Sequence, residues 1–384
     1  MLKSHLDWFF RIWDKHFHQT RVQAFETVMF LAVAHFFGFY NPKQCADYLG
    51  IPHQNFYRHL KELSLYTVRK LLVKFMVKQA VDLLKPILSK SASTISRAGI
   101  TLSVDNSVID RLGKMLRWTW SWYSGRWKKV MNGQDLLGIV ITVNGLTLPI
   151  MLVFCSKQGR RNTDKPSLLL SMLKDLITEF KKEGIDLTVF PISMDSWFVS
   201  EDLKQKLYAL GFKTVIVAGK SNYVFTIGRQ KKKVSEWKKV IVLQTGQWGI
   251  DVPFKRVRAV SPTFGPVVLC FYKKSTTKNY YLLDFSQEAK RGVEVWHIWK
   301  EHYLIECFWK ILKSVFAIKS MRPQGDGPYA ALLIKVVAYL IAIRFKTTKR
   351  FSKMSITQIM RKINRDFKLE EILHAHFHLQ FSAT

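Results

Sequence analysis

Three acidic residues stand beside apolar segments of an otherwise strongly basic chain, and their type suits divalent-metal chemistry. Asp105 ends the run 101–104, Asp195 ends a second apolar run, and Glu306 lies in a helix-like segment with Lys313 seven residues later. Carboxylate oxygens are the ligands that hard cations such as Mg²⁺ prefer. Two such ions can activate a water and stabilise the leaving oxygen in an in-line displacement at phosphorus. The three acids therefore predict a two-metal site, provided that the fold brings them together.

Each acid also has an ordinary structural interpretation. Asp105 could be a turn residue before Asn106, and Asp195 could cap the turn 196–200. Glu306 could form an ion pair with Lys310, four residues later on the same helix. Composition alone leaves both interpretations open for each residue.

The predicted helix around Glu306 carries a mostly polar stripe. Trp299, His302, Glu306, Lys310 and Lys313 recur at intervals of three or four, which places them on one helical face. A lysine two turns beyond the acid suits contact with a phosphate of the strand being cut. The alternative is a solvated face with ion pairs between successive turns.

Two predicted strands position the aspartates. The segment 100–109 contains Asp105, and the segment 187–193 precedes Asp195. Ligand-binding groups commonly collect at the carboxyl ends of such strands. The dipeptide Asn144-Gly145 between two apolar runs predicts a β-hairpin. Amphipathic spacing predicts helices at 165–182 and 200–210, with a further strand at 213–218. The alternation predicts an α/β fold, a mixed sheet with helices on its faces.

Changes of pattern divide the chain into five parts. They are a helical domain at 1–95, the first part of the α/β core at 96–218, a β-rich insertion at 219–289, the second part of the core with the Glu306 helix at 290–348, and a basic C-terminal tail at 349–384. Segments such as 240–244, 267–272 and 280–285 are predicted strands of the insertion.

The helical domain contains helix-turn-helix spacing between residues 41 and 60. A short helix ending at Gly50 and a second starting near His53 would present Gln54, Asn55 and Arg58 outward, and these types suit base edges and phosphates. An ordinary helical hairpin with a solvated polar face gives the same spacing. DNA contact is the interpretation that the charge of the chain favours.

Composition limits the class of partner. The chain has 384 residues, 60 Lys+Arg, 28 Asp+Glu and a formal net charge of +32, which favours a large nucleic-acid footprint. The four cysteines form no paired motif, so reduced thiols without structural zinc are expected. The apolar stretches 28–40 and 329–345 are shorter than the roughly 20 residues of a membrane span, and no signal-peptide pattern is present. A cytoplasmic protein that does not enter membranes is expected.

Two segments resemble the DDE transposases of IS4-type bacterial insertion sequences. They are Ser193-Met194-Asp195-Ser196-Trp197-Phe198 and the helix Ile305-Glu306-Cys307-Phe308-Trp309-Lys310-Ile311-Leu312-Lys313, and Ser103-Val104-Asp105-Asn106-Ser107 looks like the first-aspartate strand of that family. The resemblance covers roughly residues 100 to 320. It implies an RNase H-like catalytic core interrupted by a β-rich insertion, with a helical N-terminal DNA-binding domain.

The resemblance also implies a reaction and partners. Asp105, Asp195 and Glu306 would be the catalytic metal ligands for two Mg²⁺ ions, with Mn²⁺ as a substitute. The partners would be double-stranded DNA (terminal inverted repeats and target DNA) and a second copy of the chain, as a homodimer on DNA. The setting would be the cytoplasm of a bacterium or archaeon, at the nucleoid.

The family signature around the glutamate is Y-x2-R-x3-E-x6-K. Here the four positions hold Trp299, His302, Glu306 and Lys313, so the glutamate and lysine match and the other two differ. In some members an aromatic residue of the insertion stacks on a flipped base. Trp248 is the candidate for this role and Trp237 is its rival, and core packing is the alternative interpretation of both.

Two other functions stay open: a metal-dependent nuclease of RNase H-like fold, and a catalytically impaired transposase copy that acts as a DNA-binding protein.

Overall fold

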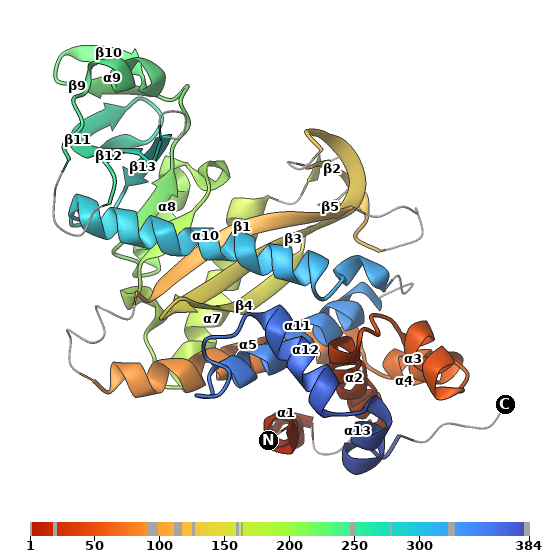
Figure 1. Cartoon of the computed structure of the whole chain (residues 1–384). Coiled ribbons are helices and arrows are strands. Elements are labelled where there is room, and N and C mark those ends of the chain that lie inside the picture. The colour runs from red at the N-terminus through yellow and green to blue at the C-terminus, as the bar shows by residue number, and fades with distance from the viewer. Residues whose placement is uncertain are drawn as a thin grey trace.

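A large mixed sheet carries helices on its surface and runs through most of the computed structural model (Figure 1). The structure describes residues 2–17, 21–90, 99–110, 117–124, 127–158, 161–162, 164–245, 251–275, 279–321 and 327–379. The chain is therefore an α/β protein with a mixed sheet, as its pattern predicts.

The eleven strands of this sheet lie in the order β10-β9-β11-β12-β13-β8-β7-β1-β3-β2, with β4 also paired to β3. Their bounds are β1 Thr101–Asp110, β2 Trp120–Ser124, β3 Lys129–Val143, β4 Leu146–Phe154, β7 Ile192–Met194, β8 Val215–Ala218, β9 Val224–Ile227, β10 Gln230–Lys233, β11 Phe254–Ser261, β12 Gly265–Lys273 and β13 Asn279–Asp284. Two short strands, β5 Lys157–Gln158 and β6 Arg161–Asn162, pair separately.

Helices form the rest of the described structure. Their bounds are α1 Leu2–Phe17, α2 Val22–Ala34, α3 Pro42–Leu49, α4 Gln54–Lys61, α5 Leu65–Leu88, α7 Lys165–Lys182, α8 Glu201–Ala209, α9 Val234–Val240, α10 Gly292–Ser314, α11 Gly327–Lys346, α12 Ile356–Asp366 and α13 Leu369–His376, with 3₁₀ turns η1 His35–Phe37, η2 Leu187–Val189, η3 Ser196–Phe198 and η4 Ile318–Ser320.

The centre of the sheet follows the predicted order closely. Strands β1, β3 and β4 pair antiparallel, whereas β1, β7 and β8 run parallel. Asn144 and Gly145 have φ of 51° and 72°, as a type I′ hairpin turn requires. The predicted strand 187–193 is wrong in its first half, which is the turn η2, because the Asp186 carboxylate accepts a hydrogen bond from the Thr188 N–H at 2.9 Å.

The segment 219–289 extends the main sheet. Its strands β9 to β13 join that sheet where β13 pairs antiparallel with β8, and Figure 1 shows them as one end of the molecule. The prediction of a strand at 240–244 is wrong: Val240 ends α9, and Gln244 makes an isolated bridge to Phe254. The β-rich character predicted for the segment is otherwise present.

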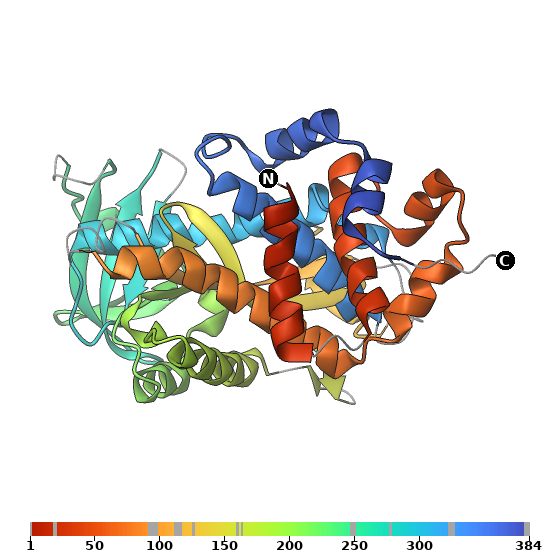
Figure 2. The same cartoon turned by 90° about the horizontal axis from the view of Figure 1, so that it is seen from below.

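The helices near the two ends of the chain pack together. Figure 2 shows α1, α2 and α5 beside α11, α12 and α13, and α11 contacts both α2 and α5. The segment predicted as a basic tail is folded as far as residue 379: Phe377 is buried, and the N–H of His378 donates to Glu26 Oε2 at 3.0 Å. Apolar residues on α12, with Ile359 and Ile363 fully or almost fully buried, explain this docking.

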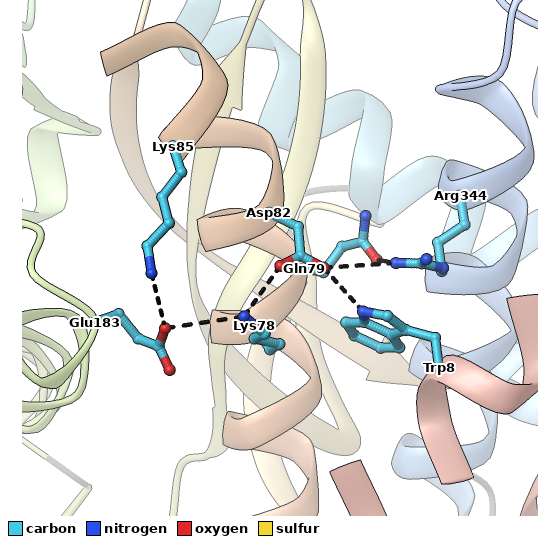
Figure 3. A network of polar contacts seen from close by, with 7 residues as sticks. All are labelled: Trp8, Lys78, Gln79, Asp82, Lys85, Glu183 and Arg344. Atoms are coloured by element: carbon cyan, nitrogen blue, oxygen red, sulfur yellow. Dashed lines mark hydrogen bonds and ion pairs between the residues drawn. The ribbon is translucent and has the colours of Figure 1, made fainter. Parts of the chain in front are cut away.

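A polar network on α5 fixes these helices to the sheet layer (Figure 3). The indole of Trp8 on α1 donates to Asp82 at 2.8 Å, and Arg344 on α11 donates to Gln79 at 3.0 Å. On the other side of α5, Lys85 bonds Glu183 at 3.3 Å, directly after α7. The helical part and the α/β core are thereby held by several shared contacts along one 24-residue helix.

One helix of the described chain is long and apolar enough to cross a membrane by composition. It is α11, and 94% of the apolar window that passes this test is buried inside the protein. Burial of this kind is typical of a core helix.

Candidate active site

The parallel pairing of β1 with β7 brings the two aspartates together. In the register of these strands Ser103 lies beside Ser193, and Val104 lies beside Met194. Asp105 and Asp195 occupy the next position on each chain. Asp105 lies inside β1, which continues along β3 to Asp110, as the predicted strand 100–109 indicates. It marks the end of the parallel pairing, where ligand-binding groups collect.

The Asp195 side chain is held in a defined turn. The residue precedes the 3₁₀ turn η3, and its Oδ1 accepts a hydrogen bond from the Ser196 N–H at 2.6 Å. The capping interpretation of Asp195 and its place at the strand end are therefore both present.

Glu306 reaches the same place from helix α10, which crosses β1 and β3 in Figure 1. A cavity of about 1290 Å³ is lined by all three acids. The Glu306 side chain is exposed on the helix, whereas Asp105 and Asp195 are half-buried. The fold thus brings together the three acids that the sequence analysis selected.

Close packing of α10 on β3 sets the height of the helix above Asp105. Gly138 pairs with Asp105 across β1 and β3, and a Cβ atom there would lie 2.7 Å from the indole of Trp309. Only glycine leaves room for this ring. The Trp309 side chain is 5% exposed, and no acceptor in the described part of the chain satisfies its Nε1–H. The indole nevertheless lies near enough to Asp105 to lower its pKa.

The acids interact electrostatically. Burial, followed by the charges of Asp195 and Glu306, raises the pKa of Asp105 to about 7, against the partial opposition of the Asn106 backbone N–H and the nearby Trp309 indole. The repulsion between neighbouring carboxylates is relieved when one of them takes up a proton or when a cation binds between them. Perturbed carboxyls of this kind occur frequently at functional sites.

Lysines surround the acids on the helix side of the cavity. Lys310 is exposed and lines the cavity. Lys313 donates from Nζ to the backbone carbonyl of Val108 at 2.8 Å, which anchors α10 to β1. Lys319 forms an ion pair with Asp110 at 2.9 Å. Lys313 therefore has a structural role in addition to the phosphate contact that the sequence predicts for it.

His302, one residue of the predicted polar stripe on the Glu306 helix, is buried in the structure. His302 is 5% exposed, and its Nδ1 lies 3.1 Å from Ser193 Oγ in the core. Burial lowers the pKa of His302 to about 4, so the ring is neutral. Trp299 stacks on it with centroids 4.5 Å apart and is only half-buried. Through its contact with Ser193, His302 supports β7, the strand that directly precedes Asp195.

Helices α3 and α4 form at the predicted places. Gly50 has φ of 66° and ends α3, and α4 begins at Gln54. Gln54 and Arg58 are exposed and line a surface pocket of about 460 Å³. Asn55 is only 4% exposed, so the prediction that it faces outward is wrong. It lies on the buried face of α4, next to Phe56, because that short helix packs against α2.

Of the two tryptophans suggested as stacking candidates in the segment 219–289, the structure describes one. Trp248 lies outside the described residues. Trp237 is 6% exposed, and its Nε1 donates to the Phe225 carbonyl at 2.9 Å, so it is a core residue.

Sequence reasoning missed a second polar group at the cavity. Asp135 on β3 is almost fully buried, accepts a hydrogen bond from Asn106 at 2.8 Å and pairs with Lys165 at 2.7 Å. The signal for it was a lone acid at the start of the apolar run of β3. This group holds Asn106, the neighbour of Asp105, in place.

The donor set at the cavity fits hard divalent cations. All three acids offer carboxylate oxygens, and no sulfur or imidazole ligand lines the cavity among the described residues. Across those same residues, no three His, Cys, Asp or Glu side chains are grouped closely enough to hold one ion together. A fit through pairs of acids, with waters or phosphate oxygens completing each ion, suits Mg²⁺.

Comparisons with known proteins found a likeness among solved structures. No protein-family model matches the chain, and no curated protein matches it. Among solved structures the chain is similar to a piggyBac transposase, in a cryo-EM structure of its synaptic complex with hairpin DNA. The two are 16% identical, the match covers 93% of this chain and 73% of that one, and the TM-score is 0.48. A likeness of this size assigns the chain to no family.

Proposed function

We propose that this protein is a DNA transposase of the DDE type, with an RNase H-like catalytic core. One observation carries the proposal: Asp105, Asp195 and Glu306, from two adjacent strands and a crossing helix, line one cavity of a chain with net charge +32. The mixed sheet and the IS4-like motifs around these residues support it. The IS4-type subgroup belongs to the proposal as well.

The three acids would hold two Mg²⁺ ions, with Mn²⁺ as a substitute, and these ions would supply a nucleophile and stabilise the leaving oxygen. The charges of Asp195 and Glu306 both act on Asp105, so Asp105 would serve both ions. A water attacks the phosphodiester at the element end and leaves a free 3′-OH. That hydroxyl then attacks a phosphodiester of target DNA in a second in-line displacement.

The remaining predicted residues would bind the DNA. Lys310 lies exposed at the cavity, where its ammonium can contact a phosphate of the strand being cut. Lys313 would hold the helix and contribute charge. Gln54 and Arg58 on α4 would contact the terminal inverted repeat. Two ends imply two active sites and so a homodimer on DNA, in the cytoplasm at the bacterial or archaeal nucleoid.

The test is a reaction of the full chain with DNA that carries the ends flanking its gene. We expect Mg²⁺-dependent strand cleavage, abolished by EDTA, and joined products when target DNA is added. Nicks without joined products would instead identify a metal-dependent nuclease. Binding without cleavage would identify an impaired copy that acts as a DNA-binding protein.

A further inference from the structure

Trp309 on α10 carries a buried hydrogen-bond donor for which the described part of the chain offers no acceptor. Its side chain is 5% exposed, and its Nε1–H makes no hydrogen bond to any described residue. The residue lines the same cavity as Asp105 and Glu306. A buried N–H group without an acceptor costs free energy, so its presence beside the acids requires an explanation.

The strand pair beneath α10 fixes the position of this indole. Gly138 lies directly opposite Asp105 in the antiparallel pairing of β3 with β1, so a side chain at Gly138 would share a sheet face with the Asp105 carboxyl. The indole fills that space, since a Cβ atom on Gly138 would lie 2.7 Å from the ring. Opposite Cβ positions are only about 5 Å apart. The ring therefore lies beside Asp105, near enough to lower the pKa of that carboxyl.

The helix places the same indole next to the third acid. Trp309 follows Glu306 by three residues on α10, so the two side chains are neighbours on the helix surface. An indole N–H can only donate a hydrogen bond, and an ionised carboxylate can only accept one. The donor of Trp309 thus lies where its complementary acceptors gather.

Resting on the proposed function, we infer that Trp309 is a positioning residue of the metal site, whose Nε1–H donates to the Asp105 carboxylate when that carboxylate binds a metal ion. One oxygen of a carboxylate that binds an ion through the other is still able to accept a hydrogen bond. Such a bond holds the carboxylate in one orientation. Loss of a hydrogen-bond partner behind a metal ligand typically costs 10- to 100-fold in metal affinity. Trp309 contacts neither the ion nor the DNA in this role.

The test measures metal binding by the full chain in the absence of DNA. Mn²⁺ is the probe, and electron paramagnetic resonance reports the concentration of the free ion. Trp309→Phe keeps an aromatic ring against Gly138 and removes the N–H. We expect this variant to fold, as thermal melting should show, and to bind Mn²⁺ about 10- to 100-fold more weakly than wild type. Equal affinity would overturn the inference.

Trp237→Phe is the matched control. Trp237 is 6% exposed and donates from Nε1 to the Phe225 carbonyl at 2.9 Å, but it does not line this cavity. Removing this N–H should lower the melting temperature and leave the Mn²⁺ affinity at the wild-type value. An equal loss of affinity in both variants would assign the effect to weaker packing and would also overturn the inference.

The indole protons give a spectroscopic readout that a purely structural role of Trp309 would not change. In ¹⁵N-labelled wild type, Mg²⁺ should move one indole N–H proton signal downfield, because that proton gains a carboxylate acceptor. Asp105→Asn should abolish the movement, and the spectrum of Trp309→Phe should lack the signal. A Trp309 signal that Mg²⁺ leaves in place would contradict the positioning role.

Two failures are distinguishable. If wild type binds Mn²⁺ and cleaves end-bearing DNA while Trp309→Phe binds Mn²⁺ equally well, the positioning role is wrong and the proposed function stands. If wild type takes up no Mn²⁺, the metal site fails, and the proposed function fails together with this inference.

Discussion

Trp309 on α10 lies directly against Gly138, the residue that pairs with Asp105 across strands β1 and β3. The helix that carries Glu306 is thus seated on the strand pair that carries Asp105. The distance between two of the three acids depends on a contact that involves neither of them.

Replacing this glycine should damage both stability and activity. A Cβ atom in Gly138→Ala would lie 2.7 Å from the indole, so helix or sheet must shift. We expect a loss of about 1–3 kcal/mol in unfolding free energy, measured by denaturant titration, and slower cleavage. The double variant Gly138→Ala/Trp309→Leu should recover part of the stability. Equal losses in the single and double variants would exclude the contact as the cause.

Asp105 should make stability depend on pH in the absence of divalent ions. Its pKa is raised from 3.8 to about 7, so the folded state keeps a proton that the unfolded chain has released. The stability from that proton is fully present below pH 3.8 and is lost as the pH rises through about 7. Asp105→Asn, which stays neutral, should therefore melt like wild type near pH 4 and at a higher temperature at pH 8.

Magnesium should restore the stability that the protein loses as the pH rises. An ion that binds only the folded state raises its melting temperature, and the acids must be ionised to bind it. We expect Mg²⁺ to stabilise wild type at pH 8 and to have little effect on Asp105→Asn. The same Mg²⁺ response in both proteins would remove Asp105 from the metal site.

Arginine at position 302, the residue of the IS4-type signature, should not improve the protein. His302→Arg would place a permanent charge where the ring is 5% exposed and bonded to Ser193. Burying such a charge without a partner costs several kcal/mol. We expect a lower melting temperature, whereas Trp299→Tyr, at a half-buried position, should be mild. A more stable and more active His302→Arg variant would show that the helix face is arranged differently.

Substitutions at Arg58 and Asn55 on α4 should have different effects, one on DNA binding and the other on stability. Arg58 is exposed on α4 and Asn55 is buried. Arg58→Ala should weaken binding to end-bearing DNA and reduce the salt slope by about one. Asn55→Ala should mainly lower the melting temperature of the protein. Arg229→Ala removes the same charge from an exposed turn on another part of the surface and serves as the control; an equal effect there would point to unspecific charge alone.

The sequence predicted those features that depend on neighbours along the chain. The hairpin at Asn144-Gly145 follows from local backbone preference, and helix 165–182 has the bounds that its spacing indicates. The placement of Asp105 near Asp195 needed one further assumption, that their strands are adjacent and parallel. The Asp135–Lys165 pair and the burial of His302 depend on contacts between distant segments, which no local pattern carries. Asn55 was misjudged because the buried face of an eight-residue helix is set by its neighbour α2.

Strand cleavage by single-acid variants tests the account most directly. The full chain and its variants Asp105→Asn, Asp195→Asn and Glu306→Gln are assayed with end-bearing DNA and Mg²⁺. Asp202→Asn and Glu371→Gln, at exposed positions outside the cavity, are the controls. We expect each of the three variants to bind DNA and to cleave it about 100-fold more slowly or not at all, since even residues behind metal ligands cost 10- to 100-fold. Full cleavage by any one of the three would contradict the two-metal site.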